Sequence, residues 1–352
     1  MSDDRSEQPG QAEQAQQAAR IAGAIRQVLG DSLGYLYPAA LRVAVRAGIP
    51  DRLVAGPRTA EELAAEAGLH GPFLYRVLRF LATRGVFRED GAGAFHLTPA
   101  AQVLRSDVPY SVRSPALLFT DEMYWKSAER LEDTVREGTT VFDDIFGIPL
   151  FDRVDGDGAP AELFSAALDS LSATEESSIA DSYGFPASGT VIDLAGGTGG
   201  FLRTVLAKNP KLRGILFERA AVLRRHRLDD PAVAGRWETT TGDLYESVPP
   251  GGDVYVLKRI IHDKSRADCL RILGNCRKAM GDDSRLLIVD AVVPREDVPP
   301  GAVLSDVLML TVFEGKERTE DEFASLLEEA GLRLLRVHPT PGSLSITEAA
   351  IG

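Results

Sequence analysis

Cysteines and long apolar runs are scarce in this sequence. The two cysteines, Cys269 and Cys276, lie seven positions apart on one predicted helix, with no Cys or His at zinc-ligand spacing. We therefore expect buried, reduced thiols and no metal. No apolar run approaches the roughly 20 residues needed to span a bilayer, and no basic and then apolar segment typical of a signal peptide opens the sequence. These absences indicate a cytoplasmic protein without a membrane partner.

Basic residues are also in deficit. Lys and Arg number 39 against 52 Asp and Glu, which gives a formal net charge of −13. Nucleic-acid binding depends on clustered cations, and here the cations are outnumbered and spread along the chain, which argues against a nucleic-acid partner. The chain has 352 residues and is 44% hydrophobic and 26% charged. It can therefore bury a sizeable core, and its length favours two domains over one.

A glycine-rich turn at residues 195–200 is the centre of the pattern. The apolar run at residues 190–194 predicts a strand that carries Asp193 near its end, and the apolar spacing after Gly200 predicts a helix. Such a turn lets the backbone approach a ligand closely. A dinucleotide would place its pyrophosphate beside the Asp193 carboxylate, whereas a sulfonium cofactor with a cationic tail suits that charge. We therefore favour S-adenosylmethionine, with a purely structural turn as the alternative.

Strand and helix patterns alternate from this turn to the end of the chain. The predicted strands span residues 190–194, 213–218, 236–241, 253–258, 284–290, 332–338 and 344–351. This alternation predicts an α/β fold with a doubly wound, mostly parallel, seven-stranded Rossmann-like sheet, in which ligands bind beyond the carboxyl ends of the strands. Five polar residues fall at those ends: Asp193, Glu218, Asp243, Lys258 and Asp290. Glu218 follows Asp193 by 25 residues, the position of a ribose ligand.

The N-terminal part of the chain predicts a different domain. Residues 1–15 are polar and typical of a disordered tail. Residues 16–105 begin with apolar helices suited to a partner chain. A helix with a capping box at Thr59 and Glu62, a second helix after Pro72 and a hairpin around residues 90–93 follow, which is the order of a winged helix. Such a module can bind DNA or serve in folding and dimerisation, and the acidity of the chain favours dimerisation.

Residues 106–186 predict a helical connector between this domain and the cofactor-binding domain at residues 187–352. The connector is rich in aromatic and apolar side chains. Most of these are expected to form core, and some are well placed to wall a pocket for a flat aromatic substrate. The Gly- and Asp-rich stretch at residues 155–158 predicts a loop between two of its helices.

A histidine follows the fourth predicted strand. His262 lies just beyond residues 253–258, at the mouth of the predicted cofactor crevice, where its near-neutral pKa suits a general base. Asp290, at the end of the fifth strand, and Glu317 could orient its ring or stabilise the imidazolium. Glu317 also precedes a helix capped by Thr319, so a surface role is the alternative for this carboxylate.

These segments together resemble the small-molecule O-methyltransferases of the caffeic-acid type and their bacterial relatives in natural-product biosynthesis. The matching segments are residues 193–199, 242–244, 262–263 and 315–319 with 322–323, in the order and spacing of the family. The resemblance extends over nearly the whole chain, including an α-helical N-terminal winged-helix dimerisation domain. It implies a homodimer that transfers the methyl group of S-adenosylmethionine, without a metal, to a phenolic hydroxyl of an aromatic, polyketide-derived intermediate.

The resemblance also implies roles for individual residues. The cofactor would be held by Asp193, Gly196, Gly197, Glu218, Asp243, Leu244 and Lys258. His262 would deprotonate the acceptor hydroxyl, with Asp290 and Glu317 beside it. The acceptor pocket would be lined by Trp125, Phe142, Phe164, Leu168, Leu171, Met309 and Phe313.

Three positions depart from the family pattern. Ala195 replaces a glycine of the loop, Lys264 stands where the family usually has tryptophan, and Glu314 occupies a usual glycine position. None of them removes the cofactor site or His262. Relatives that decarboxylate or hydroxylate with the same fold and cofactor are the nearest alternative, and the intact His262 favours methylation. A ligand-sensing DNA-binding regulator and a nicotinamide-dependent oxidoreductase are alternatives from other classes.

Overall fold

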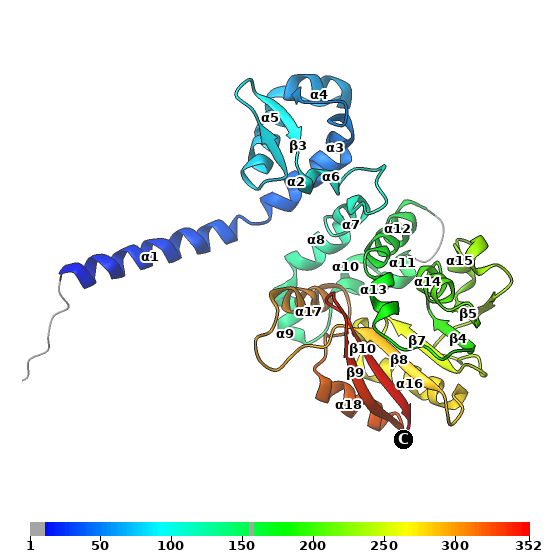
Figure 1. Cartoon of the computed structure of the whole chain (residues 1–352). Helices are drawn as coiled ribbons and strands as arrows, with labels where there is room; N and C mark the ends of the chain where they lie inside the picture. The colour runs from blue at the N-terminus through cyan, green and yellow to red at the C-terminus, as the bar shows by residue number, and fades with distance from the viewer. Residues whose placement is uncertain (1–10, 155–157) are drawn as a thin grey trace, which may run out of the picture. The chain divides into compact units, whose positions relative to one another are not determined.

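The computed structural model describes residues 11–154 and 158–352, in two compact units that divide between Asp107 and Val108 (Figure 1). The first ten residues of the expected tail lie outside the described residues. Residues 11–15 are not a tail, because they begin helix α1 (Gln11–Ser32), where Ala, Gln and Glu are good helix formers. Most of the predicted loop at residues 155–158 also lies outside the described residues, and Gly158 precedes helix α12.

The first unit contains helices and a three-stranded antiparallel sheet of order β1-β3-β2. The predicted capping box opens α4, since the Thr59 hydroxyl accepts from the N–H of Glu62 and the Glu62 carboxylate accepts from the N–H of Thr59. The predicted order of two helices and a hairpin is confirmed. Its elements are α1, α2 (Leu36–Arg46), α3 (Ile49–Arg52), β1 (Arg58–Thr59), α4 (Ala60–Ala67), α5 (Gly71–Thr83), β2 (Phe87–Glu89), β3 (Ala94–Leu97) and α6 (Pro99–Gln102).

Helix α1 leaves a row of apolar side chains in solvent. Ile21, Ile25, Val28 and Leu29 are each more than half exposed, with fractions of 53%, 54%, 63% and 61%. Their spacing of three and four residues places them along one stripe of the helix. Exposed apolar stripes of this length mark interaction surfaces, as the sequence predicts for this segment.

The second unit opens with a run of helices, most of which share one apolar core. The helices are α7 (Arg113–Leu118), α8 (Glu122–Glu129), α9 (Leu131–Glu137), α10 (Phe142–Phe146), α11 (Leu150–Val154), α12 (Ala159–Ala173) and α13 (Glu176–Asp181). Buried side chains of α7, α8, α10, α11 and α12 form a cluster with one residue of a later helix, called here the connector core, of Leu118, Met123, Tyr124, Phe142, Leu150, Val154, Ala167 and Val312. The predicted helical connector is therefore a packed layer that includes one residue from the C-terminal part of the chain.

A seven-stranded sheet of order β6-β5-β4-β7-β8-β10-β9 forms the rest of the second unit (Figure 1). Neighbouring strands are parallel from β6 to β8, and β10 is antiparallel to both β8 and β9. The strands are β4 (Gly189–Leu194), β5 (Leu212–Glu218), β6 (Trp237–Thr241), β7 (Val254–Lys258), β8 (Arg285–Asp290), β9 (Leu332–Pro339) and β10 (Ser345–Ile351). The helical segments between them are α14 (Gly200–Lys208), α15 (Ala220–Leu223), η1 (Pro231–Val233), η2 (Ile261–Asp263), α16 (Arg266–Ala279), α17 (Pro300–Val312) and α18 (Glu320–Glu329).

Side chains alternate between the two faces of this sheet, as its central strands require. Tyr255 and Leu257 pack in a core with α16 and α18, whereas Val254 and Val256 pack in a second core with α13 and α14. Helices thus cover both faces. Strand order reverses at β4, which lies between β5 and β7, and such a switch point is where doubly wound sheets bind ligands. None of the described helices is long and apolar enough to cross a bilayer.

Candidate active site

The loop after β4 wraps around the carboxyl group of Asp193. Ala195, Gly197 and Gly199 all have a positive φ, of 53°, 60° and 82°. Gly196 lies so close to this carboxyl group that an added Cβ would be 2.4 Å from it, so only glycine fits there. The departure at Ala195 is therefore an alanine in a left-handed conformation, which glycine adopts more readily.

Asp193 is a buried acid without a strong partner. Its side chain is buried, and neither carboxyl oxygen makes a hydrogen bond of good geometry with a described residue, although the N–H of Leu202 favours its charged form. Burial raises the pKa of Asp193 to about 7, and the nearby Lys258 acts in the opposite direction. A buried carboxyl of this kind fits a cationic ligand, because a cation would supply the missing partner.

Two further predicted cofactor residues lie at neighbouring strand ends. Glu218, at the end of β5, accepts from the N–H of Gly197 at 3.1 Å and from the N–H of Arg219 at 2.7 Å. Asp243 follows β6 and accepts from the N–H of Tyr245 at 2.8 Å. The side chain of Leu244 is buried in the core beside α16, and its carbonyl accepts from Asn275 at 2.9 Å. The structure thus places these residues at or just after the ends of neighbouring parallel strands, and their role in holding the cofactor stays a prediction.

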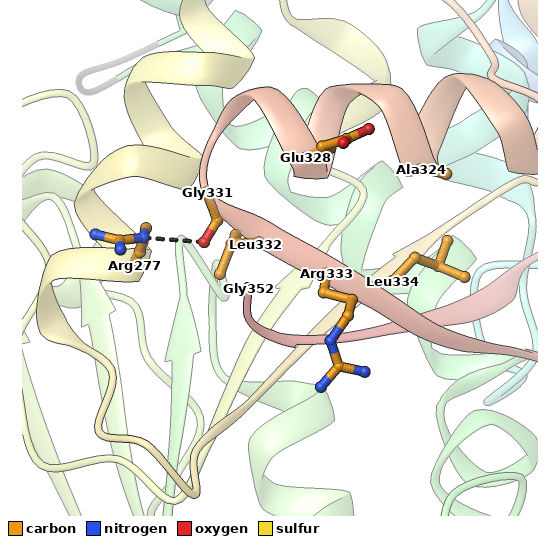
Figure 2. A pocket seen from close by; sticks show the side chains of 8 residues that line it. All are labelled: Arg277, Ala324, Glu328, Gly331, Leu332, Arg333, Leu334 and Gly352. Carbon is orange, nitrogen blue, oxygen red and sulfur yellow. Dashed lines mark hydrogen bonds between the residues drawn. The ribbon is translucent and has the colours of Figure 1, made fainter.

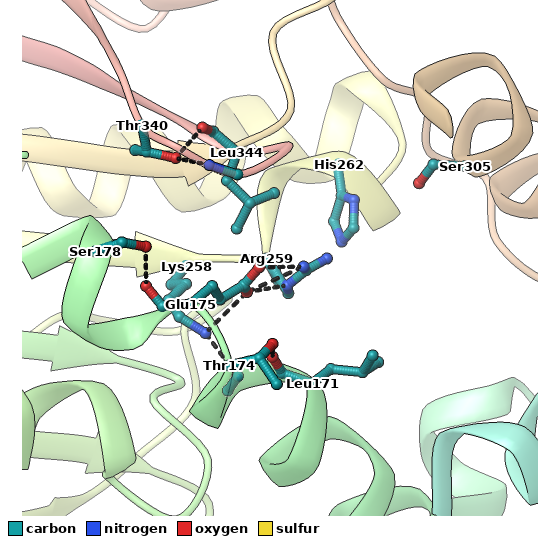
Figure 3. A network of polar contacts seen from close by, with 12 residues as sticks. Leu171, Thr174, Glu175, Ser178, Lys258, Arg259, His262, Ser305, Thr340 and Leu344 are labelled. Carbon is teal, nitrogen blue, oxygen red and sulfur yellow. Dashed lines mark hydrogen bonds and ion pairs between the residues drawn. The ribbon is translucent and has the colours of Figure 1, made fainter. Parts of the chain in front are cut away.

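Lys258 closes the crevice on the side of β7. Its side chain is only 8% exposed, its ammonium donates to the hydroxyl of Ser172 at 2.6 Å, and Glu175 lies 3.8 Å away. Burial lowers the pKa of Lys258, while Glu175 raises it. Figure 3 shows Lys258 next to Glu175, with Thr174 close by. The role of this corner was not visible in the sequence, because nothing in a pair of adjacent glutamates distinguishes it from a solvated surface.

Glu176, the neighbour of Glu175, points to the start of α14. Its carboxyl lies against Gly200, where an added Cβ would be 2.6 Å from Oε1, and it accepts from the hydroxyl of Thr204 at 3.4 Å. Burial raises the pKa of Glu176. A carboxylate therefore covers the positive end of the helix that follows the glycine loop.

His262 lies on η2 between two of the predicted carboxylates. Its ring Nδ1 is 3.1 Å from Oε1 of Glu317, and its backbone N–H donates to the carboxylate of Asp290 at 3.2 Å. Glu317 is itself fixed, since it accepts from Ser305 at 2.6 Å and its N–H donates to Asp306 at 2.8 Å. The sequence predicted the association of His262, Asp290 and Glu317, and the structure brings the three together.

In this cluster, burial and the neighbouring charges and hydrogen bonds have opposite effects on the pKa values of His262 and Glu317. Burial lowers the pKa of His262, but the charge of Asp290 and the hydrogen bond to Glu317 outweigh it, so the pKa of His262 is raised overall. Burial raises the pKa of Glu317, but its hydrogen bonds to His262 and Ser305 prevail and lower it overall. Burial raises the pKa of Asp290. Because ionised Glu317 can only accept, the ring proton of neutral His262 lies on Nδ1, and Nε2 presents its lone pair.

Gly315 and Arg318 hold this loop in place. Both belong to the segment at residues 315–319 that matches the family pattern, but the sequence did not reveal what they do. A Cβ on Gly315 would lie 2.1 Å from the carbonyl oxygen of His262, so the two backbones touch only because Gly315 has no side chain. The buried Arg318 donates to the carbonyl of Ile261 at 2.7 Å and to that of Lys264 at 3.3 Å. Both residues act from outside the crevice to fix the segment that carries His262.

Six of the seven predicted acceptor residues lie on four helices of the second unit, and the seventh, Phe313, directly follows α17. Phe142, Phe164 and Phe313 belong to or pack against the connector core. Phe151, which was not singled out in the sequence, joins them, with its ring 5.5 Å from that of Phe313 and 6.2 Å from that of Phe164. The others are distributed as follows: Trp125 on α8, Leu168 and Leu171 on α12, and Met309 on α17. Whether all seven share one cavity stays a prediction.

Lys264, in the usual position of a tryptophan, turns toward these aromatics. Its ammonium lies 3.9 Å from the ring centroid of Phe151 and 3.1 Å from Asp263. A cation on a ring face beside a carboxylate is a stable arrangement. Glu314, the third departure, accepts from the hydroxyl of Thr139 at 3.3 Å and so stays at the surface.

A separate hollow lies at the opposite edge of the sheet. It has a volume of about 570 Å³, and Figure 2 shows its lining residues, Arg277, Ala324, Glu328, Gly331, Leu332, Arg333, Leu334 and Gly352. Because β10 begins opposite Asp290 and runs antiparallel to β8, its end at Ile351, just before Gly352, is remote from the carboxyl ends of the parallel strands. No predicted site residue lines this hollow. Within the described residues, no cluster of His, Cys, Asp and Glu could hold a metal ion.

The sheet order, the glycine loop around an acid and the carboxylate at the end of β5 define the class of S-adenosylmethionine-dependent methyltransferases. A family model for the O-methyltransferase domain matches residues 128–333, and one for the O-methyltransferase dimerisation domain matches residues 31–107. The chain belongs to this O-methyltransferase family.

Individual relatives and solved structures support the same family. The chain is 38% identical to the phenazine O-methyltransferase of Lysobacter antibioticus over 90% of its own length and 93% of that protein. A methyltransferase of calicheamicin biosynthesis, solved with S-adenosylhomocysteine, matches with a TM-score of 0.84 and 44% identity, over 95% of this chain and 99% of that one. An O-methyltransferase of neocarzinostatin biosynthesis, solved with S-adenosylmethionine and 2-hydroxy-5-methyl naphthoic acid, matches with a TM-score of 0.78 and 29% identity, over 90% and 96%.

Proposed function

We propose that this chain is a cytoplasmic, homodimeric enzyme that methylates a hydroxyl group of an aromatic natural-product intermediate with S-adenosylmethionine. The position of His262 carries the proposal. Its Nδ1 faces Glu317, so Nε2 is left to accept a proton at the sheet edge that also bears Asp193 and the glycine loop. A base beside a crevice for a sulfonium cofactor is what methyl transfer to a weakly acidic hydroxyl requires.

Seven residues would hold the cofactor. The buried carboxyl of Asp193 and the backbone at Gly196 and Gly197 suit its cationic amino-acid part, and Glu218 suits the ribose hydroxyls. Asp243 and Leu244 would frame the adenine, and Lys258 would approach from β7. When bound, S-adenosylmethionine supplies a methyl group on a sulfonium, which is already an activated donor.

The chain's own contribution is to remove a proton and to position the acceptor oxygen. A phenol with a pKa near 10 is a weak nucleophile at neutral pH. Nε2 of neutral His262 takes the hydroxyl proton, and Glu317 and Asp290 stabilise the imidazolium that forms. Gly315 and Arg318 keep the loop fixed, so that the base is held in place before the acceptor arrives.

The acceptor would bind against the aromatic side chains of the connector. Phe164 and Phe313 would provide ring faces and edges for stacking on a flat substrate, and Trp125, Leu168, Leu171 and Met309 would complete the wall. Phe142 is fully buried, so it would support this wall from the connector core. One relative is named as a phenazine O-methyltransferase, and another was solved with a naphthoic acid. We therefore propose that the acceptor of this chain is also aromatic and that it derives from a polyketide.

The other readings fit the site less well. Decarboxylation or hydroxylation would leave the His262–Glu317 pair without a proton to take from a hydroxyl. The acidic Asp193 opposes the pyrophosphate of a nicotinamide cofactor. The net charge of −13 opposes a DNA-binding regulator.

Calorimetric titration with S-adenosylhomocysteine, with NADH as the control, tests the cofactor. We expect binding of S-adenosylhomocysteine alone. Binding of NADH, or of neither compound, would contradict the proposal, while the fold would stand.

Replacement of the base tests the reaction. In His262→Ala, we expect methyl transfer to an aromatic hydroxyl at neutral pH to fall by about 10² to 10⁴ in kcat, the usual contribution of a general base, with unchanged binding of S-adenosylhomocysteine. The matched control is His338→Ala, because His338 also pairs with a glutamate, Glu348, at 2.8 Å but lies on β9. Unchanged turnover of His262→Ala at saturating acceptor would remove this residue from the mechanism.

A further inference from the structure

Arg259 has an unusual backbone. It directly follows β7 and has a φ of +57°, in the left-handed region that residues with a side chain seldom adopt. Its N–H donates to the carbonyl of Val289 at 3.0 Å, which ties the turn to β8. Backbone strain of this kind persists where the surrounding structure enforces it, and it concentrates at functional sites.

A buried carboxylate fixes the direction of the Arg259 side chain. Nε and Nη2 donate to the two carboxyl oxygens of Glu175, both at 3.0 Å, which is a bidentate pair. Glu175 is only 15% exposed and is itself held at the corner between α12 and α13, where its carbonyl accepts from Ser178. The guanidinium plane is therefore set before any ligand binds.

The opposite edge of the same guanidinium is available. Arginine carries five N–H donors, and within the described residues Nη1 of Arg259 donates to no side chain or carbonyl. The side chain is 28% exposed, so this edge can be reached. The pairing with Glu175 thus presents a fixed donor rather than consuming the arginine.

This edge lies near the proposed base. Figure 3 shows the Arg259 guanidinium and the His262 ring projecting into the same region, bordered by Leu171 and Ser305. The charge of Arg259 also lowers the pKa of both Asp290 and Glu317, the two carboxylates that contact His262. An acceptor with its hydroxyl at His262 therefore has a neighbouring substituent within the field of Arg259.

We propose that Arg259 is a specificity-determining residue that selects aromatic acceptors with a carboxylate next to the hydroxyl that is methylated. Nη1 donates to the carboxylate oxygen while Nε2 of His262 accepts the hydroxyl proton. Glu175 is a positioning residue, since it acts only through Arg259. This assignment rests on the proposed methyl transfer, because it places the acceptor hydroxyl at His262.

Two matched probes test the preference. With saturating S-adenosylhomocysteine, the binding of 1-hydroxy-2-naphthoate and of 1-naphthol would be measured by calorimetry. A charge-assisted hydrogen bond corresponds to about 10- to 100-fold in affinity, so we expect the wild-type protein to bind the carboxylate at least about 10-fold more tightly. Equal affinity for the two probes, or no binding of either, would overturn the proposal.

Three variants identify the residue responsible. We expect Arg259→Met to abolish the preference and to leave the affinity for 1-naphthol unchanged. Arg259→Lys, which keeps the charge and loses the fixed fork, should reduce the preference at least about fivefold. The control is Arg266→Met, which also removes one positive charge, but at the start of α16 and from an exposed pair with Glu329. This control should keep the full preference, and its loss would show that general charge rather than Arg259 is responsible.

The double variant Glu175→Gln/Arg259→Met guards against misfolding, because it removes both members of the bidentate pair, and Lys258 keeps its hydrogen bond to Ser172. Binding of S-adenosylhomocysteine reports the fold of each variant. Retention of the preference in any folded variant without Arg259 would overturn the proposal. The failure of this proposal and the failure of the proposed function can be told apart. A protein that binds S-adenosylhomocysteine and methylates both probes equally well keeps the proposed function and contradicts only the role of Arg259.

Discussion

The ionisation of His262 is set by its neighbours. Asp290, Glu317 and Asp263 all favour the imidazolium, against the effect of burial. The charge of Arg259 in turn favours the ionised forms of Asp290 and Glu317. A residue that was chosen from the sequence for an ordinary pKa therefore has a raised one in the folded chain.

This raised pKa predicts a pH profile. If His262 is the base, as we propose, it acts only when neutral, and a raised pKa keeps the imidazolium to higher pH. Methyl transfer should then increase as the pH rises through a value above the usual 6.5 or so. In Glu317→Gln, the loss of a carboxylate should move this limb of kcat/KM to lower pH and also reduce its plateau. A limb that stays in place in Glu317→Gln would show that another group controls the profile.

At the scale of an element, the glycine loop separates two causes of sensitivity. In Gly196→Ala, the new Cβ would meet the Asp193 carboxyl at 2.4 Å, so the loop must move. We expect the free energy of unfolding to fall by roughly 2 kcal/mol or more, with weaker binding of S-adenosylhomocysteine. In Gly197→Ala, the space is open and only the φ of 60° is unfavourable, which costs about 1 kcal/mol.

Urea unfolding of the two variants measures the difference. Ala195→Gly is the reference, since it removes a side chain at the same kind of left-handed position and should destabilise neither the loop nor the fold. Equal losses in Gly196→Ala and Gly197→Ala would mean that the contact with Asp193 is relieved without cost.

The sequence predicted regular elements better than contacts between them. Each of the seven strands is where the apolar runs placed it, within a residue or so, because alternation in strands and helices is a local signal. The approach of Asp290 to His262 was also predictable, because parallel strands end at one edge, whereas Glu317 lies between α17 and α18 and was expected there only from its place in the motif. Glu175, Arg259 and Arg318 were missed, since their partners lie 84 and 57 residues away and no local pattern records such a pair. The expected end of the tail at residue 15 was wrong, because α1 already begins at Gln11. Polar segments that are rich in alanine can still be helical.

At the scale of the whole molecule, the exposed stripe of α1 predicts the assembly. The family match to a dimerisation domain begins at residue 31, next to this stripe. We expect light scattering to show a dimer, and Ile25→Asp/Leu29→Asp to dissociate it, because two charges would be buried in an apolar contact. Val135→Asp is the control, since Val135 is an isolated apolar residue on α9 with 72% exposure. A double variant that stays dimeric would place the interface elsewhere.

The carboxylate of Glu176 at the start of α14 bears on competition among metabolites. Nucleotides share the adenosine half with S-adenosylmethionine, so the residues for ribose and adenine cannot tell these compounds apart. The start of a helix normally attracts phosphates, and here a fixed negative charge already covers it. We therefore expect the chain to disfavour adenine nucleotides through repulsion between their phosphates and the carboxylate of Glu176.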